Sequence, residues 1–175
     1  MMTDINKIFI RNAVESEQDI IRAIVEEAYE EYARTMSDSM REEYNRRLVA
    51  TLGIKESVER IVAESGGNIV GCVLLYHSTS SASERVVRNP GWAELRLLAV
   101  HPSTRGHGVG ALLVQECIRR AQVNGERAIG LHTKDEMHSA VRLYERLGFT
   151  RFQDLDFSPA SGVLLKGYCY NLDNR

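Results

Sequence analysis

The sequence has little excess charge of either sign. Its 22 Lys and Arg residues against 24 Asp and Glu residues leave a formal net charge of -2 at pH 7. Proteins that bind nucleic acid normally show a basic excess or a basic stripe, so the charge gives no reason to expect a nucleic-acid partner. No apolar run approaches the roughly 18 residues that a membrane span needs, and the N-terminus lacks the apolar core of a signal peptide. We therefore expect a cytoplasmic chain with neither a nucleic-acid nor a membrane partner.

Cysteine is also scarce. The chain has three, an odd number at wide spacing, and each lies in an apolar segment: Cys72, Cys117 and Cys169. Cysteines in such segments are ordinarily buried thiols, so we expect neither a disulfide nor a metal site from them, which fits a reducing compartment. The five histidines show no ligand spacing such as H-E-x-x-H, and the sequence therefore predicts no metal ion.

The length and composition indicate one folded unit. With 175 residues, of which 43% are hydrophobic, the chain is long enough to bury one substantial core and too short to promise two. No internal repeat and no low-complexity tract divides it. We expect a single domain over residues 1–175.

Apolar periodicity predicts the elements of the first half of the chain. Gly66 and Gly67 separate two alternating runs, as the turn of a β-hairpin does. The polar stretch 78–91 that follows is expected to be a long exposed loop. The predicted elements before it are strands at 7–14, 59–65 and 68–77 and helices at 16–36 and 38–53.

The second half of the chain contains a strand-helix-strand unit, a further helix and a closing pair of strands. Gly148 stands where a helix C-cap glycine is expected. The complete order of elements predicts an α/β domain with a mixed sheet of about seven strands. The predicted elements are strands at 92–102, 127–133, 150–157 and 162–172 and helices at 108–124 and 137–149.

A glycine-rich segment, RGHGVG at residues 105–110, leads into the third predicted helix. A helix N-terminus has unpaired N–H groups and a partial positive charge, and glycines let an anion approach that backbone closely. A phosphate group is therefore the expected ligand, although glycines can also simply shape a tight turn.

Two known phosphate-binding patterns fit this loop poorly. A Walker A loop fails because no Gly-Lys-Ser/Thr follows. Gly106, Gly108 and Ala111 satisfy the dinucleotide pattern G-x-G-x-x-G/A, but its first glycine should follow the strand almost directly, and here the residues HPSTR intervene. Because only one βαβ unit is visible, nicotinamide binding stays a minor alternative.

The third pattern is R-x-x-G-x-G, formed by Arg105, Gly108 and Gly110 after a strand that ends in Leu-x-Val-x-Pro. With this pattern the chain resembles the GNAT superfamily of N-acetyltransferases. The segment AVRLYERLGF at residues 140–149 resembles the second signature of that superfamily, in which a tyrosine precedes a Leu-Gly-Phe end. The resemblance implies the acyl-CoA N-acyltransferase fold, an α/β fold with a mixed, mostly antiparallel sheet of about seven strands and helices on both faces.

By this resemblance acetyl-CoA is the co-substrate, and its pyrophosphate lies on the backbone N–H groups of the glycine loop. The pantetheine arm would bond free backbone groups of the preceding strand, as a neighbouring strand would. Where the family commonly has an asparagine that touches the cofactor, this chain has Met137, with His138 and Ser139 beside it as substitutes. The implied cofactor-binding residues are Leu98, Ala99, Val100, Arg105, Gly106, His107, Gly108, Val109, Gly110 and Ala111.

Acyl transfer to an amine needs a neutral amine, stabilisation of the oxyanion and a proton for the leaving thiolate. Tyr144 resembles the family's general acid, and its alternative role is that of a half-buried aromatic. Glu94 stands where several family members place a catalytic glutamate that acts directly or through water, and its ordinary pKa makes it a weak base until burial raises that pKa. Its alternative is a solvated charge at a strand entrance. His132 is a lesser base candidate, and backbone N–H groups of residues 98–100 would bind the oxyanion.

The resemblance also implies that residues 16–50 line the acceptor side of the cleft, with Tyr29 and Tyr32 as substrate-binding residues. Six glutamates of this stretch would attract a cationic amine where they face the cleft, and otherwise form a solvated helix face. They are Glu26, Glu27, Glu30, Glu31, Glu42 and Glu43.

We therefore expect an acetyl-CoA-dependent N-acetyltransferase, a monomer or homodimer, in which the amine attacks the thioester directly. A small-molecule amine or polyamine is the first expected acceptor, and a peptide or protein amino group is the second. The alternative is a non-catalytic acyl-CoA-binding or regulatory module of the same fold.

Overall fold

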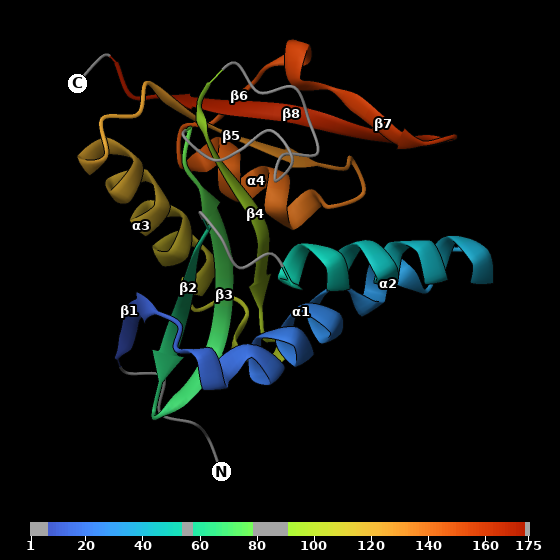
Figure 1. Cartoon of the computed structure of the whole chain (residues 1–175), viewed down its shortest axis with the longest axis horizontal. Coiled ribbons are helices and arrows are strands. Elements are labelled where there is room, and N and C mark those ends of the chain that lie inside the picture. The colour runs from blue at the N-terminus through green and yellow to red at the C-terminus, as the bar shows by residue number, and fades with distance from the viewer. Residues whose placement is uncertain (1–6, 54–57, 79–90, 174–175) are drawn as a thin grey trace. The chain divides into compact units, whose positions relative to one another are not determined.

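The structure is a computed structural model, and it describes residues 7–53, 58–78 and 91–173. Most of the predicted loop 78–91 lies outside the described residues. The helices are α1 (Gln18–Ala33), α2 (Asp38–Gly53), α3 (Val109–Val123) and α4 (His138–Arg146). The strands are β1 (Ile8–Asn12), β2 (Val58–Ser65), β3 (Asn68–Tyr76), β4 (Ala93–Val100), β5 (Ala128–Thr133), β6 (Thr150–Arg151), β7 (Phe157–Ala160) and β8 (Val163–Asn171) (Figure 1). Short 3-10 helices cover Glu15–Glu17, Pro102–Thr104 and Gln153–Leu155.

The strands form an eight-stranded sheet in the order β1-β2-β3-β4-β5-β8-β6, with β7 paired to β8. The pairs β1–β2, β5–β8, β6–β8 and β7–β8 are antiparallel, whereas β4 and β5 are parallel. The fold is thus the predicted mixed, mostly antiparallel α/β arrangement. The parallel strands β4 and β5 are those of the predicted strand-helix-strand unit around α3. Such a unit requires a parallel pair, because a crossover connection joins parallel strands.

The strand expected at 150–157 is wrong as one element. It is divided into β6, a 3-10 turn and β7, so the described residues contain eight strands where about seven were predicted. In the turn Leu155 is buried over Gly167 of β8, where a Cβ on the glycine would clash with the Leu155 Cβ. An ion pair brackets the turn, since Arg151 Nη1 donates to Asp156 Oδ1 at 2.6 Å.

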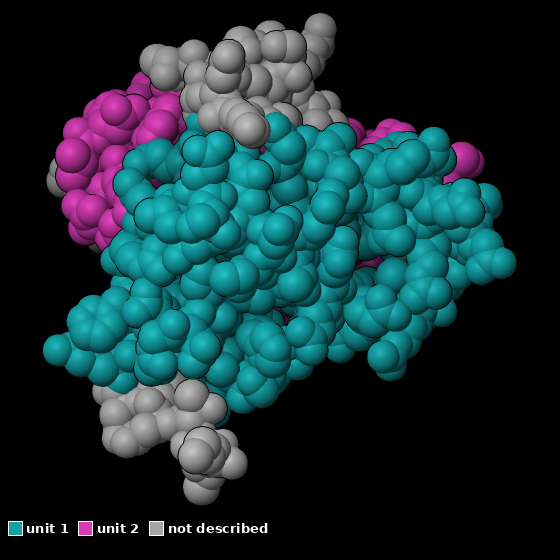
Figure 2. All heavy atoms as spheres, turned by 60° about the horizontal axis from the view of Figure 1, so that its bottom comes forward, with its two compact units in different colours: residues 1–74, 97–113 teal, residues 75–96, 114–175 magenta. Residues whose placement is uncertain are grey.

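The chain contains two compact units, coloured separately in Figure 2. Unit 1 comprises residues 1–74 and 97–113, and unit 2 comprises residues 75–96 and 114–175. The strands β3 and β4 and the helix α3 each contribute residues to both. The expectation of one domain over residues 1–175 stays a prediction.

In unit 1, helices pack on both faces of β3. Cys72 belongs to a buried cluster with Ile21, Ile24 and Val25 of α1. At the adjacent position on the opposite face, a Cβ added to Gly71 would lie 2.9 Å from Val109 Cγ1, at the first residue of α3. Side chains alternate between the faces of a strand, so α1 covers one face and the start of α3 the other. The missing side chain of Gly71 lets α3 begin close against the sheet.

In unit 2, an aromatic row closes the end of α4. The Tyr144 and Phe149 ring centroids are 5.8 Å apart, and those of Phe149 and Tyr170 are 5.5 Å apart. Gly148 lies between them in the sequence with φ +104, and a Cβ there would approach Tyr170 Cε2 to 3.0 Å. The left-handed backbone and the close ring both require glycine, so the predicted helix-ending glycine is confirmed.

Candidate active site

The glycine loop has the backbone shape that an anion site needs. Gly106 and Gly108 have φ values of +81 and +80, which few other residues adopt without strain. A Cβ at either position would meet nothing within 4 Å. The α-helix begins directly afterwards at Val109, so its unpaired first-turn N–H groups lie at the end of the loop. The glycines are therefore needed for the backbone conformation, and the space outside them is open to a ligand.

Two side chains of the loop are turned back onto the protein. Arg105 Nη2 donates to the carbonyl oxygen of Ala28 at 3.1 Å, and Arg105 Nη1 lies 3.2 Å from Glu31 Oε1. His107 Nδ1 lies 3.1 Å from the carbonyl oxygens of Thr104 and Arg105, which makes it a donor to them. The guanidinium thus ties the loop to α1, and the backbone is what the loop offers to an anion.

The strand before the loop leaves β geometry at Leu97. Its φ of +51 is the only positive value at a non-glycine residue in the part of the chain that the structure describes. Beyond it, His101 N–H donates to Val70 O of β3 at 2.8 Å, and Ala99 O lies against Gly71 of β3. Backbone groups of alternate residues point to opposite edges of a strand, so those of Leu98 and Val100 point away from β3. This is the edge predicted to hold pantetheine.

The two predicted acceptor-binding tyrosines lie on α1, in unit 1. The Tyr29 hydroxyl donates to the carbonyl oxygen of Leu98 at 2.9 Å. The ring of Tyr32 lies 6.1 Å from that of Tyr29, and partial burial and the Glu31 carboxylate raise the pKa of Tyr32. Tyr29 therefore contacts the predicted cofactor edge itself.

Most of the six glutamates of α1 and α2 are ion-paired. Glu27 Oε2 lies 3.2 Å from His101 Nε2, and Glu31 pairs with Arg105 at 3.2 Å, so these two carboxylates face the β4 end and the glycine loop. The other paired glutamates form a solvated helix face, the alternative considered from the sequence, since their partners are exposed residues in or next to α1 and α2. Those pairs are Glu26 with Arg22, Glu30 with Arg41 and Arg34, and Glu43 with Arg46 and Arg47.

Glu94 is not a solvated charge. Its side chain is 3% exposed, and Arg96 holds it through Nε to Oε1 at 2.8 Å and Nη2 to Oε2 at 3.0 Å. His132 Nδ1 lies 3.5 Å from Glu94 Oε1. Burial acts to raise the pKa of Glu94, but the hydrogen bonds from His132 and Arg96 outweigh it and lower the pKa to about 2. Burial thus acts in the expected direction, but the net pKa lies below that of a free carboxylate, which is the opposite of what a general base needs.

The partners of Glu94 are themselves buried and engaged. The Arg96 guanidinium carbon lies 4.6 Å from the ring centroid of Tyr76. His132 Nε2 lies 2.7 Å from the carbonyl oxygen of Leu155, to which it donates, and Phe157 meets the imidazole edge-on. These residues form a buried polar network of unit 2, and the sequence interpretation missed the role of Arg96. The available signal was the spacing, because residues 94 and 96 lie on one face of a strand.

Tyr144 and Met137 occupy the two ends of α4, also in unit 2. Tyr144 is buried, with 5% of its surface exposed, and not half-buried as its alternative role supposed. Met137 is at the N-cap position of α4 without a side-chain capping hydrogen bond, and the Thr133 hydroxyl lies 3.6 Å from its sulfur. His138 and Ser139, the suggested substitutes for a family asparagine, are exposed in the first turn. The catalytic role of Tyr144 stays a prediction.

The cysteines are free thiols. Cys72 and Cys117 are buried, and burial raises the pKa of Cys72 to about 12. No cluster of three metal-ligating side chains occurs among the described residues. Within the same residues, no helix is long and apolar enough to cross a membrane.

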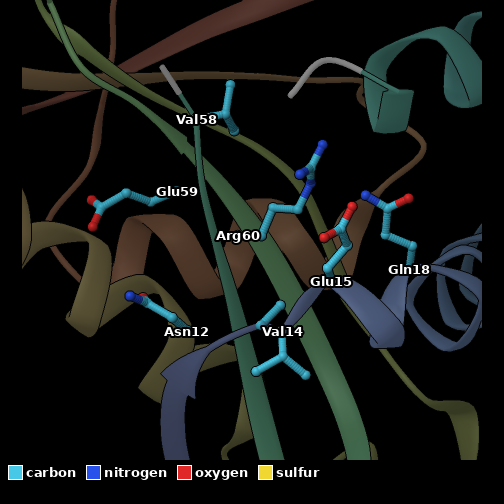
Figure 3. A pocket seen from close by; sticks show the side chains of 8 residues that line it. Asn12, Val14, Glu15, Gln18, Val58, Glu59 and Arg60 are labelled. Carbon is cyan, nitrogen blue, oxygen red and sulfur yellow. The ribbon is translucent and has the colours of Figure 1, made fainter. Parts of the chain in front are cut away.

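An open pocket of about 390 Å³ lies near the N-terminus of α1, away in sequence from both signatures. Figure 3 shows the side chains of Glu15, Gln18 and Arg60 on one side of β2 and that of Glu59 on the other. Arg60 Nη2 donates to the carbonyl oxygen of Leu52 at 3.0 Å. None of the predicted site residues lines this pocket.

Comparisons with known proteins agree with this geometry. The family model described as Acetyltransferase (GNAT) family matches residues 19–149. An uncharacterized N-acetyltransferase of Schizosaccharomyces pombe is 25% identical over 155 residues, which are 87% of this chain and 90% of the relative.

Solved structures share the fold. The PaiA N-acetyltransferase of Thermoplasma acidophilum, in complex with coenzyme A, is 16% identical with a TM-score of 0.69, over 94% of this chain and 99% of that one. The YncA acetyltransferase of Salmonella typhimurium, solved with acetyl-CoA, is 19% identical with a TM-score of 0.63, over 96% of this chain and 95% of that one. Together with the glycine loop at the start of α3, the family match shows that this chain belongs to the GNAT acetyltransferase family and is an acetyl-CoA-dependent N-acetyltransferase.

Proposed function

We propose that the enzyme acetylates a cationic primary amine, a small-molecule amine or polyamine first and a peptide or protein amino group second, by direct attack on the thioester. The binding of acetyl-CoA in this proposal rests on one observation. Gly106 and Gly108 at the N-terminus of α3 have left-handed backbone with open space around it. Residues 105–111 would hold the pyrophosphate through backbone N–H groups, because the Arg105 side chain is engaged with α1. The backbone edge of Leu98, Ala99 and Val100 would hold the pantetheine.

In the proposed reaction the amine nitrogen bonds to the thioester carbonyl carbon, the carbon-sulfur bond breaks, and the coenzyme A thiolate takes up a proton. The state of two of the three cysteines supports a direct attack over an acetylated enzyme, whereas Cys169 is only half-buried. An acyl-enzyme route needs a nucleophile, and the buried Cys72 thiol, with its pKa raised to about 12, forms little thiolate at neutral pH. Cys117 is fully buried.

The proton of the amine limits what Glu94 contributes. A lysine-like ammonium has a pKa of about 10.4, so its deprotonation at pH 7 costs about 4.6 kcal/mol. A carboxylate whose pKa is lowered is a poorer proton acceptor than an ordinary carboxylate, so passing that proton to Glu94 costs more than releasing it to the solvent at pH 7. We therefore assign the attack to the amine in its neutral form. Glu94 serves as the buried anion that fixes Arg96 and His132, and a direct base role would require that ion pair to open.

Tyr144 remains our candidate for the acid that protonates the thiolate. A thiol of pKa near 8.5 is a tolerable leaving group even without help, so the hydroxyl need supply only part of the rate enhancement. The family signature around residues 140–149 supports this assignment.

The preference for a cationic acceptor rests on the charge of α1. Glu27 and Glu31 point toward the end of β4 and the glycine loop, and their partners are a histidine and an already engaged arginine. Arg105 already compensates the charge of Glu31, so Glu27 is the carboxylate that would attract an ammonium group. The Tyr29 and Tyr32 rings on the same helix add a face on which a cation binds favourably.

An acceptor panel tests the proposal. Coenzyme A release from acetyl-CoA is measured with a polyamine, a monoamine, a free-amino-terminus peptide and a lysine peptide. We expect turnover with the amines and highest kcat/KM with the polyamine. Highest kcat/KM with a peptide would reverse the order of acceptors. Acetyl-CoA binding without turnover on any of them would favour the non-catalytic module. Exchange of labelled coenzyme A into acetyl-CoA without an amine would contradict direct attack.

A further inference from the structure

The backbone of β4 is irregular at Leu97, and Tyr29 of α1 contacts the next residue of the strand. Leu97 has a φ of +51 within the strand, and such left-handed backbone is unfavourable for a leucine. The following carbonyl, that of Leu98, accepts the hydrogen bond of the Tyr29 hydroxyl at 2.9 Å. The surroundings hold the irregular residue in place, because Leu97 and Tyr29 both pack against the same core cluster of unit 1. Strained backbone of this kind persists where neighbouring groups fix it and often serves function.

The bond to Leu98 fixes a whole peptide plane. In a trans peptide the carbonyl of one residue and the N–H of the next point in opposite directions, so holding Leu98 O also sets the direction of Ala99 N–H. Ala99 O faces Gly71 and His101 N–H faces Val70, so β4 is anchored to β3 on its other edge. With both edges held, the backbone groups of Leu98 and Val100 on the edge away from β3 have a fixed orientation.

We infer that Tyr29 is a positioning residue for acetyl transfer: its hydroxyl holds the Leu97 irregularity so that the β4 backbone meets the thioester in a fixed orientation. The inference rests on the proposed function, in which this edge carries the pantetheine and the oxyanion. It gives the Tyr29 hydroxyl a role in addition to the one expected from the sequence, where Tyr29 was to bind the acceptor. A carbonyl oxygen has two lone pairs, so Leu98 O can accept from Tyr29 and from pantetheine together.

Tyr29→Phe tests this role, with Tyr44→Phe as the matched control. Tyr44 belongs to the same aromatic cluster, its ring centroid 6.5 Å from that of Tyr29, whereas the hydrogen bond to Leu98 comes from the Tyr29 hydroxyl. We expect Tyr29→Phe to lower kcat about tenfold, the effect of one neutral hydrogen bond expressed in the transition state, with coenzyme A affinity within twofold. Tyr44→Phe should leave kcat within twofold. Equal kcat losses in both variants, or none in Tyr29→Phe, would overturn the inference.

A second pair of variants separates positioning from general packing. Glycine adopts φ +51 without strain, so in a Leu97→Gly background the irregularity no longer needs the hydroxyl. Tyr29→Phe should then change kcat less than threefold, whereas in a Leu97→Ala background it should keep its tenfold effect. The same loss in both backgrounds would overturn the inference. A wild-type protein that acetylates no amine would instead fail the proposed function before any variant is compared.

Discussion

Arg96 holds the carboxylate of Glu94 in a buried two-bond ion pair, with nitrogen-oxygen distances of 2.8 and 3.0 Å. This relationship changes the chemistry that Glu94 can perform. A carboxylate with hydrogen bonds from Arg96 and His132 is stable as an anion, and its pKa falls to about 2 despite burial. It is therefore a weak proton acceptor at neutral pH.

The pH profile of a Glu94→Gln variant follows from this. With a lysine-like acceptor, kcat/KM of the wild type should rise about tenfold per pH unit between pH 6 and 9, as the neutral amine becomes available. Glu94→Gln should lower kcat/KM by the same factor at every pH in that range, because it disturbs the site and removes no base. A defect of about 100-fold at pH 7 that disappears toward pH 9 would restore Glu94 as the base.

The same ion pair predicts a contribution to acid stability. The pKa of Glu94 is lowered in the folded state from about 4.3 when unfolded, so its stabilisation is complete above that pH and is lost as pH falls toward 2. The shift corresponds to about 3 kcal/mol. In denaturant titrations, wild type should lose about 3 kcal/mol more between pH 5 and 2 than the double variant Glu94→Gln, Arg96→Met. Equal losses in the two proteins would mean that the pair does not lower this pKa.

Tyr144→Phe tests the acid assignment. We expect kcat to fall about 100-fold, the low end for general acid catalysis, with acetyl-CoA affinity preserved. Tyr170→Phe is the matched control, since Tyr170 belongs to the same aromatic row at the end of α4 and carries no proposed chemistry. If kcat at saturating acetyl-CoA is unchanged in Tyr144→Phe, the hydroxyl packs or positions and does not donate the proton.

Periodicity and glycine placement were enough to predict most of the fold. The second helix begins where the sequence predicts, at Asp38, and the hairpin around Gly66 and Gly67 connects β2 and β3. The glycine loop was also predictable, because left-handed backbone at a helix start has few other solutions. These helices, turns and loops depend on the conformational preferences of residues close together in the sequence, so the sequence alone indicates them.

The features that could not be predicted depend on contacts between distant segments. Glu94 meets His132 because β4 and β5 pair in parallel with Glu94 opposite Gly130, a register that neither strand specifies alone. Nothing in the residue type of Leu97 indicates a left-handed backbone. The division of the strand expected at 150–157 depends on the close fit of Leu155 against Gly167. Gly71 is a further case, since its role appears only where α3 packs on β3.

The most direct test of the account is the acetyl-CoA affinity of Gly108→Ala beside that of Gly67→Ala, measured by titration calorimetry. The two glycines have φ values of +80 and +78 and open space around a Cβ, so alanine imposes the same backbone strain at both. Only Gly108 lies in the proposed pyrophosphate loop, and Gly67 lies in the β2–β3 hairpin. We predict similar losses of stability, with acetyl-CoA binding at least tenfold weaker in Gly108→Ala and unchanged in Gly67→Ala. Wild-type affinity in a folded Gly108→Ala protein would contradict the account.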